Sequence, residues 1–252
     1  MTRRSFIAGL ATTAVVAAVS ACGSSSSTTS ASSAPAAAAA VKGGTLNILM
    51  STQTEHWDPQ RVYVGVNIEA GNRLFTRTLV TWSATSSDTE VAKIVPDLAT
   101  DTGKVSEDGK TWSFTLKDGV KWQDGKDVTA DDVKYGISRT FAVDVITGGP
   151  NYAIAFLDIP TDADGSSAYK GPYAKTGQAL YDKAVTVSGK TVTFKLKTPV
   201  MDFNNTVTMT AFAPFRADKD LGDKSNYDIF STGPYKLDGV WTAEKGGSFV
   251  RN

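Results

Sequence analysis

The chain has 252 residues, of which 41% are apolar and 10% aromatic, and its 26 Lys and Arg balance 26 Asp and Glu. A formal net charge of zero excludes a nucleic-acid-binding protein that relies on a basic surface. The single cysteine excludes an internal disulfide, and one cysteine with one histidine does not make a zinc site.

The first 22 residues predict an export signal. A pair of arginines precedes an apolar stretch that ends at Val19 and is too short to span a membrane. Small residues directly before Cys22 resemble a lipobox, in which the thiol receives a diacylglycerol, so Cys22 is the candidate lipidation site. An ordinary cleavage site with a cysteine nearby is the alternative. The paired arginines fit both twin-arginine and general export.

A low-complexity stretch over residues 23–40 follows this signal. It consists almost entirely of Ser, Thr and Ala. Because such a segment can bury little apolar surface, burial cannot offset the conformational entropy that it would lose on folding. We expect a disordered tether. A flexible coil of this length has a reach of roughly 25 Å, which holds a folded body clear of a membrane surface.

The folded part is predicted to open with a strand over residues 45–50. Apolar side chains at alternate positions, from Leu46 to Met50, define one side of this strand. The polar loop 51–59 follows its carboxyl end, which is where open α/β sheets bind ligands. The loop is therefore a candidate ligand wall. A helix is predicted next, around residues 68–75.

A turn, a strand and a capped helix are predicted in the middle of the chain. The Asp-Gly pair at residues 108–109 supplies the turn. Apolar side chains from Trp112 to Leu116 then alternate with hydroxyl residues, as in a strand with one buried face. Thr129, followed three residues later by Asp132, predicts the start of a helix whose apolar residues recur at four-residue spacing.

The rest of the chain alternates irregular and regular stretches. Residues 140–182 are rich in Gly, Pro, Asp and Tyr and predict irregular surface structure with a short helix or two. Residues 184–196 predict a hairpin, because alternating apolar residues flank a turn at Ser188 and Gly189.

Several of these segments together resemble the extracellular solute-binding proteins that serve ABC importers for oligopeptides, dipeptides and nickel. They are Val-Pro-Asp-Leu-Ala at 95–99, Lys-Asp-Gly-Val-Lys-Trp at 117–122, Thr-Ala-Asp-Asp-Val at 129–133, Ser-Thr-Gly-Pro-Tyr at 231–235 and the strand end at 249–252. The resemblance implies an α/β fold, a mixed α+β lobe of the type II periplasmic-binding-protein kind. It also implies that a second lobe would follow Asn252, so that this is the N-terminal portion of such a protein, from an incomplete sequence or a truncated gene.

The resemblance also divides the chain into segments. The two segments already expected from their own residues, the lipoprotein signal peptide at 1–22 and the Ser/Ala tether at 23–40, precede the part that the resemblance covers. Residues 41–67 and 184–252 form an incomplete main lobe, and residues 68–183 form a small inserted subdomain.

By motif position, the resemblance implies a ligand site without catalytic residues, metal or cofactor. In this family two lobes close on an extended ligand and hold its main chain by backbone hydrogen bonds. The residues carried over to this role are Gln53, Thr54, Glu55, His56, Tyr152, Thr232 and Gly233. Trp57 stands where the family has a leucine, and we expect it to be packed rather than to face a ligand.

The predicted function is that of a substrate-binding lipoprotein of an ABC importer, which delivers oligopeptides, dipeptides or similar solutes to membrane permeases. We expect a monomer, anchored by lipid to the outer face of the cytoplasmic membrane, with no enzymatic activity and no nucleic-acid partner. One alternative is an exported peptide-sensing receptor or chaperone-like binding protein. Another is an exported hydrolase whose catalytic residues lie beyond Asn252. Peptide, nickel chelate and sugar all stay open as the solute.

Overall fold

The computed structural model describes residues 43–252, and residues 49–252 pack as one unit. The predictions for the signal peptide, the tether and Cys22 lie outside the described residues. No helix in the described part of the chain has the length and apolar content of a membrane span.

A four-stranded antiparallel sheet organises the fold. Its order is β3 (Lys104–Val105), β4 (Thr111–Thr115), β6 (Thr191–Lys195), β5 (Val185–Ser188). The central ladder places Trp112 opposite Phe194 and Phe114 opposite Val192, and all four side chains are buried. Hydroxyl and lysine side chains alternate with them on the other face, as the period of two requires. The predicted strand at 112–116 and the predicted hairpin are confirmed.

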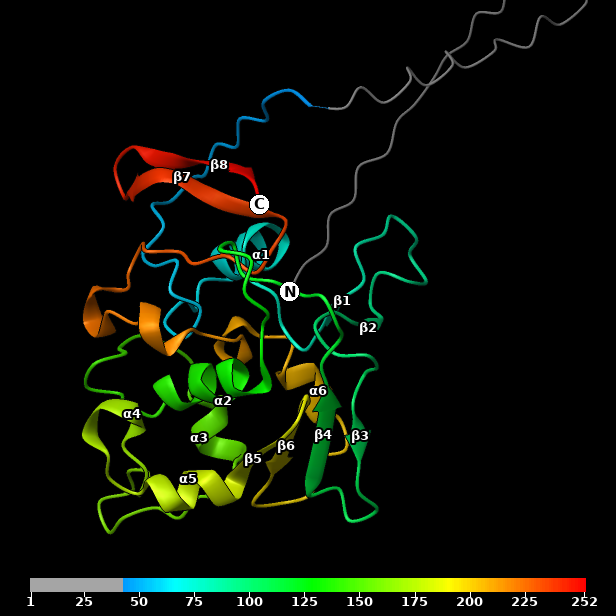
Figure 1. The fold of residues 1–252 in the computed structure, drawn as a ribbon, viewed down its shortest axis with the longest axis vertical. Coiled ribbons are helices and arrows are strands. Elements are labelled where there is room, and N and C mark those ends of the chain that lie inside the picture. The colour runs from blue at the N-terminus through cyan, green and yellow to red at the C-terminus, as the bar shows by residue number, and fades with distance from the viewer. Residues whose placement is uncertain (1–42) are drawn as a thin grey trace, which may run out of the picture. The chain divides into compact units, whose positions relative to one another are not determined.

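Two helices cover the apolar face of this sheet. α2 (Ala130–Arg139) and α5 (Gln178–Ala184) both pack against β5 and β6 (Figure 1). α2 begins as predicted: the Asp132 amide donates to the Thr129 hydroxyl at 3.1 Å, and the Thr129 amide donates to the Asp132 carboxylate at 2.9 Å. This reciprocal pair satisfies two amides that have no partner within the helix.

Phe203 lies at the centre of the core between sheet and helices. It begins the short helix α6 (Phe203–Thr206) and is fully buried. Its ring meets those of Phe194 at 5.6 Å, Phe212 at 5.8 Å and Phe156 at 6.1 Å between centroids. Edge-to-face pairs of this kind contribute about 0.5–1.5 kcal/mol each beyond the burial of area. They join segments that are distant in the sequence.

The elements outside this sheet, its two covering helices and α6 are α1 (Gly65–Leu74), β1 (Val80–Trp82), β2 (Ile94–Pro96), α3 (Tyr152–Phe156), α4 (Gly171–Ala174), η1 (Thr210–Phe212), η2 (Ala217–Lys219), η3 (Gly222–Lys224), β7 (Tyr235–Thr242) and β8 (Gly246–Arg251). α1 confirms the helix predicted around residues 68–75. The irregular stretch predicted to hold a short helix or two contains three short helices, α3, α4 and α5. β1 pairs with β2, and β7 pairs with β8 in a hairpin.

The strand predicted over residues 45–50 is wrong. Residues 43–50 form neither strand nor helix, and the side chains of Leu46 and Leu49 are 83% and 97% exposed. A strand needs a neighbour for its backbone hydrogen bonds, and no described strand pairs with this segment. Every ladder among the described strands is antiparallel, so the rule that places ligands beyond parallel strands does not apply to the loop that follows.

The mixed α/β fold is confirmed, and the sheet crosses the boundary that the sequence predicts at residue 184. β4 comes from residues 68–183, whereas β5 and β6 come from residues 184–252. The division into a main lobe and a small inserted subdomain stays a prediction.

Candidate ligand-binding site

A buried ion pair fixes the loop that carries most of the predicted site. Arg139, the last residue of α2, donates to both carboxylate oxygens of Asp58 at 2.8 and 2.7 Å, and neither side chain is exposed to solvent. Two parallel bonds between a guanidinium and a carboxylate also fix the orientation of both groups. α2 therefore sets the position of the loop at Asp58.

The same arginine joins a second acidic group to this network. Its Nε donates to Asp220 at 3.1 Å, and the hydroxyls of Tyr135 and Tyr173 donate to the same carboxylate oxygen at 2.8 and 2.7 Å. Burial alone would raise the pKa of Asp220, but the charge of Arg139 and these hydrogen bonds hold it below its ordinary value. Asp220 is therefore a charged partner at neutral pH.

A turn near the carboxyl-terminal hairpin holds the loop from another side. The amides of Trp57 and Asp58 donate to the Asn226 carbonyl at 2.7 and 3.3 Å. The Tyr227 hydroxyl donates to the Thr54 carbonyl at 2.9 Å. The loop from residue 54 to residue 58 is thus a fixed element even though it contains no strand or helix.

The loop presents some of its predicted site residues to solvent and packs others. Gln53 and Glu55 are exposed and free to contact a ligand, whereas Thr54 is buried and its hydroxyl lies 3.5 Å from Asn67 Oδ1. His56 is half-buried, and burial followed by the charge of Arg61 lowers its pKa below the ordinary value. His56 is therefore neutral at neutral pH.

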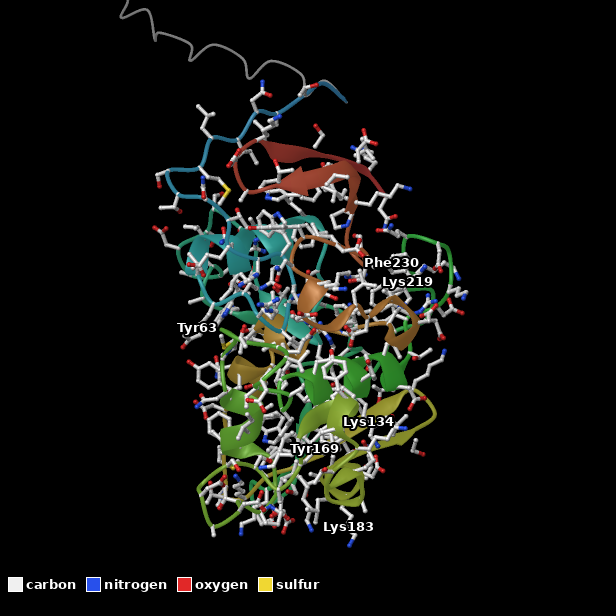
Figure 2. The ribbon with its side chains drawn as sticks, turned by 90° about the vertical axis from the view of Figure 1, so that its left-hand side faces the viewer. Tyr63, Lys134, Tyr169, Lys183, Lys219 and Phe230 are labelled. Atoms are coloured by element: carbon white, nitrogen blue, oxygen red, sulfur yellow. The ribbon has the colours of Figure 1, made fainter. Side chains whose placement is uncertain are left out.

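A pair of tyrosines marks a second part of the site. Tyr152 begins α3 and is half-buried, and its hydroxyl lies 3.0 Å from that of Tyr63, which is 54% exposed and lies at the periphery of the view in Figure 2. The hydrogen bond to Tyr152 raises the pKa of Tyr63. The sequence reasoning missed Tyr63, because no motif or periodicity marks it.

Thr232 and Gly233 pack against the end of α1. Both amides donate to the Phe75 carbonyl, at 3.0 and 3.1 Å, and the Thr232 hydroxyl accepts from the Arg77 amide at 3.1 Å. A Cβ on Gly233 would lie 2.6 Å from the Leu74 carbonyl oxygen, so only glycine fits this close approach. These contacts give both residues a structural role. A role in ligand binding stays a prediction for them, as for the other site residues.

Trp57 is packed, as expected. It is 3% exposed, and its ring meets those of Phe75 at 5.2 Å, Trp241 at 5.0 Å and Phe249 at 6.4 Å. Because Trp241 and Phe249 belong to β7 and β8, this cluster fastens the loop to the hairpin.

The chemistry of the site is that of hydrogen bonding. Within residues 43–252, no group of three or more His, Cys, Asp or Glu side chains is placed to hold a metal ion. Exposed amide, carboxylate and phenol groups on a fixed frame can instead pair with the polar groups of a ligand.

Solved structures of similar proteins share this fold. Clavulanic acid biosynthesis oligopeptide binding protein 2 is 32% identical with a TM-score of 0.64, and the match covers 74% of this chain and 32% of that one. The murein tripeptide binding protein MppA of Escherichia coli is 27% identical with a TM-score of 0.57, and the match covers 75% and 34% of the two chains. The predicted fold, a partial lobe of such a protein, is confirmed.

Curated relatives match over shorter stretches. The oligopeptide-binding protein OppA of Bacillus subtilis is 31% identical over 140 residues, which are 53% of this chain and 24% of that protein. A dipeptide-binding protein of Escherichia coli is 32% identical over 105 residues, 39% of this chain and 18% of that protein. The chain thus spans about a quarter or less of these relatives. The family model for bacterial extracellular solute-binding proteins, family 5 middle, matches residues 93–252, more than half of the chain. This chain therefore belongs to family 5 of the bacterial extracellular solute-binding proteins.

Proposed function

We propose that this chain belongs to the substrate-binding lipoprotein of an ABC importer, which binds oligopeptides, dipeptides or similar solutes and passes them to membrane permeases. The observation that carries the proposal is the loop that ends at the buried Arg139–Asp58 pair and exposes polar side chains. Membership of a solute-binding family and relatives named for oligopeptide and dipeptide binding support it.

Binding would use main-chain hydrogen bonds to an extended ligand. Gln53 and Glu55 are exposed, and His56 is neutral. The Gln53 amide and the His56 imidazole can each donate and accept hydrogen bonds, and the Glu55 carboxylate can accept them. The hydroxyls of Tyr63 and Tyr152 would add a second contact point. Because the loop is already fixed by its anchors, little conformational entropy is lost when a ligand binds.

Export and attachment complete the proposal. Cys22 would carry the lipid that holds the protein at the outer face of the cytoplasmic membrane, and the transporter's ATPase would supply the energy for import. Metabolic labelling with an alkyne fatty acid tests this step: the mature protein should take up label, and a Cys22→Ala variant should not. Label that persists in Cys22→Ala would refute attachment at this residue.

Calorimetric titration of the mature protein, as the gene encodes it, tests ligand binding. We expect peptides of two to five residues to bind, and free amino acids at the same concentration to give no signal. Glu55→Gln should weaken binding of peptides with a free amino group, whereas Glu107→Gln, a matched change in an exposed turn, should not. If no peptide in the panel binds, the proposed function is wrong.

A further inference from the structure

A cavity of about 80 Å³ lies next to the tyrosine pair. Its walls come from the loop at Gln60, the end of α2 and the segment from residue 143 to residue 154. The apolar side chains that line it are Val143, Ile146, Pro150 and Ile154.

Two glycines bring the walls together without filling the space between them. Gly149 lies so close to Gln60 that a Cβ on it would stand 1.9 Å from the Gln60 carbonyl oxygen. Gly148 has a φ of +85°, which side-chain-bearing residues rarely adopt. The close approach of these two loops therefore depends on residues that add no side chain to the cavity.

Two polar side chains in the cavity wall, those of Gln60 and Thr140, already have partners. The side-chain Nε2 of Gln60 donates to the Ala213 carbonyl at 3.1 Å, and its side-chain Oε1 accepts from Arg139. The Thr140 hydroxyl donates to the Ile137 carbonyl at 2.8 Å. A polar guest would lose its water contacts and gain no new hydrogen bond from these groups. Away from Asn151, the wall of the cavity therefore favours an apolar group.

The lining of the cavity reaches the residue that precedes Tyr152. Asn151 lines the cavity, is exposed and makes no side-chain hydrogen bond to cap α3. It directly precedes Tyr152, whose hydroxyl pairs with that of Tyr63. A ligand main chain that meets Tyr152 would therefore lie beside residues that line the cavity, Asn151 and Ile154.

We propose that this cavity receives an aliphatic side chain of the bound peptide, of the size of valine or leucine; this inference rests on the proposed function. A dry apolar cavity of about 150 Å³ takes up benzene, so a space of 80 Å³ that is open on one side suits a branched chain of about three or four carbons. Since each buried methylene contributes about 0.8 kcal/mol, replacing alanine by leucine at that position should tighten binding by at least about tenfold.

Titration of the mature, full-length protein with tripeptides tests the inference. The panel is trialanine and the three peptides in which one alanine is replaced by leucine. We expect one leucine peptide to bind at least about tenfold more tightly than trialanine. Val143→Trp should fill the cavity and abolish this preference, and Val91→Trp, which is similarly exposed and does not line the cavity, should keep it. Ile154→Ala should enlarge the cavity and shift the preference toward phenylalanine.

The outcomes separate the two proposals. If trialanine and the leucine peptides bind equally, or if the leucine preference survives in Val143→Trp and is unchanged in Ile154→Ala, the cavity is not a side-chain site, although the protein still binds peptides. If no tripeptide binds to the unmodified protein, the proposed function fails instead. Thermal unfolding of each variant shows whether a lost preference reflects a lost fold.

Discussion

Removing the carboxylate of Asp58 should strongly destabilise the protein. Asp58→Ala deletes two hydrogen bonds from Arg139, at 2.8 and 2.7 Å, and one from the backbone amide of Gln60 at 3.0 Å. It leaves the Arg139 guanidinium fully buried without this partner. Breaking a buried pair by removing one partner costs about 3–5 kcal/mol. Asp220 still faces Arg139 at 3.1 Å, so the expected loss is at the lower end, about 3 kcal/mol. That is a large part of the roughly 5–15 kcal/mol that holds a domain folded.

Urea unfolding of the mature protein measures this loss as a change in the free energy of unfolding. The matched control is Asp127→Ala, which breaks the pair with Lys121, whose side chain is 52% exposed while that of Asp127 is 69% exposed. An exposed pair contributes about 0–1 kcal/mol, so the control should change little. Replacing both Asp58 and Arg139 by leucine should not restore the lost stability, because it leaves the buried carboxylate of Asp220 without its charged partner. Equal effects of Asp58→Ala and Asp127→Ala would refute the assignment of Arg139 as the anchor.

Three further predictions concern the fold. The folded pKa of Asp220 lies below its unfolded value of about 3.9, so its stabilising contribution is present above about pH 4 and is lost as pH falls toward the folded pKa; Asp220→Asn should flatten this part of the stability profile measured by urea unfolding. Thr129→Ala removes the cap of α2 and should lower the free energy of unfolding by about 1 kcal/mol; no change would mean that the cap is unimportant. Gly233→Ala should lower the melting temperature, because its Cβ would stand 2.6 Å from a carbonyl oxygen, whereas Gly65→Ala, which meets nothing within 4 Å, should not; equal effects would contradict the close packing.

The parts of the fold that the sequence predicts are those whose signals are local. The strand from Trp112 and the helix start at Thr129 each depend on residues within a few positions, and both are confirmed. The strand at residues 45–50 is wrong because alternation shows only that a strand would have an apolar side. It does not show that a partner strand is present.

The anchors of the site were beyond sequence reasoning for a related reason. Arg139 and Asp58 are 81 residues apart, and Tyr63 and Tyr152 are 89 residues apart. Neither pair has a fixed spacing or a periodic pattern, so each becomes visible only when the fold brings its members together. An arginine in the last turn of a helix is ordinarily interpreted as a solvated charge that interacts with the negative end of the helix dipole. No neighbouring residue in the sequence marks Arg139 as buried.

The motif at residues 231–235 and the loop at residues 53–55 place different physical demands on their side chains. Ser-Thr-Gly-Pro-Tyr is recognisable because Gly233 must approach Leu74 closely and Thr232 must pair with the backbone at Phe75 and Arg77. These contacts stabilise the fold of this chain, whatever its solute. An exposed loop residue such as Gln53 meets no such demand, and it can change without cost to the fold. Family membership therefore constrains the frame of the site, and the identity of the solute must be sought in side chains that no motif marks, among them those lining the cavity beside Tyr152.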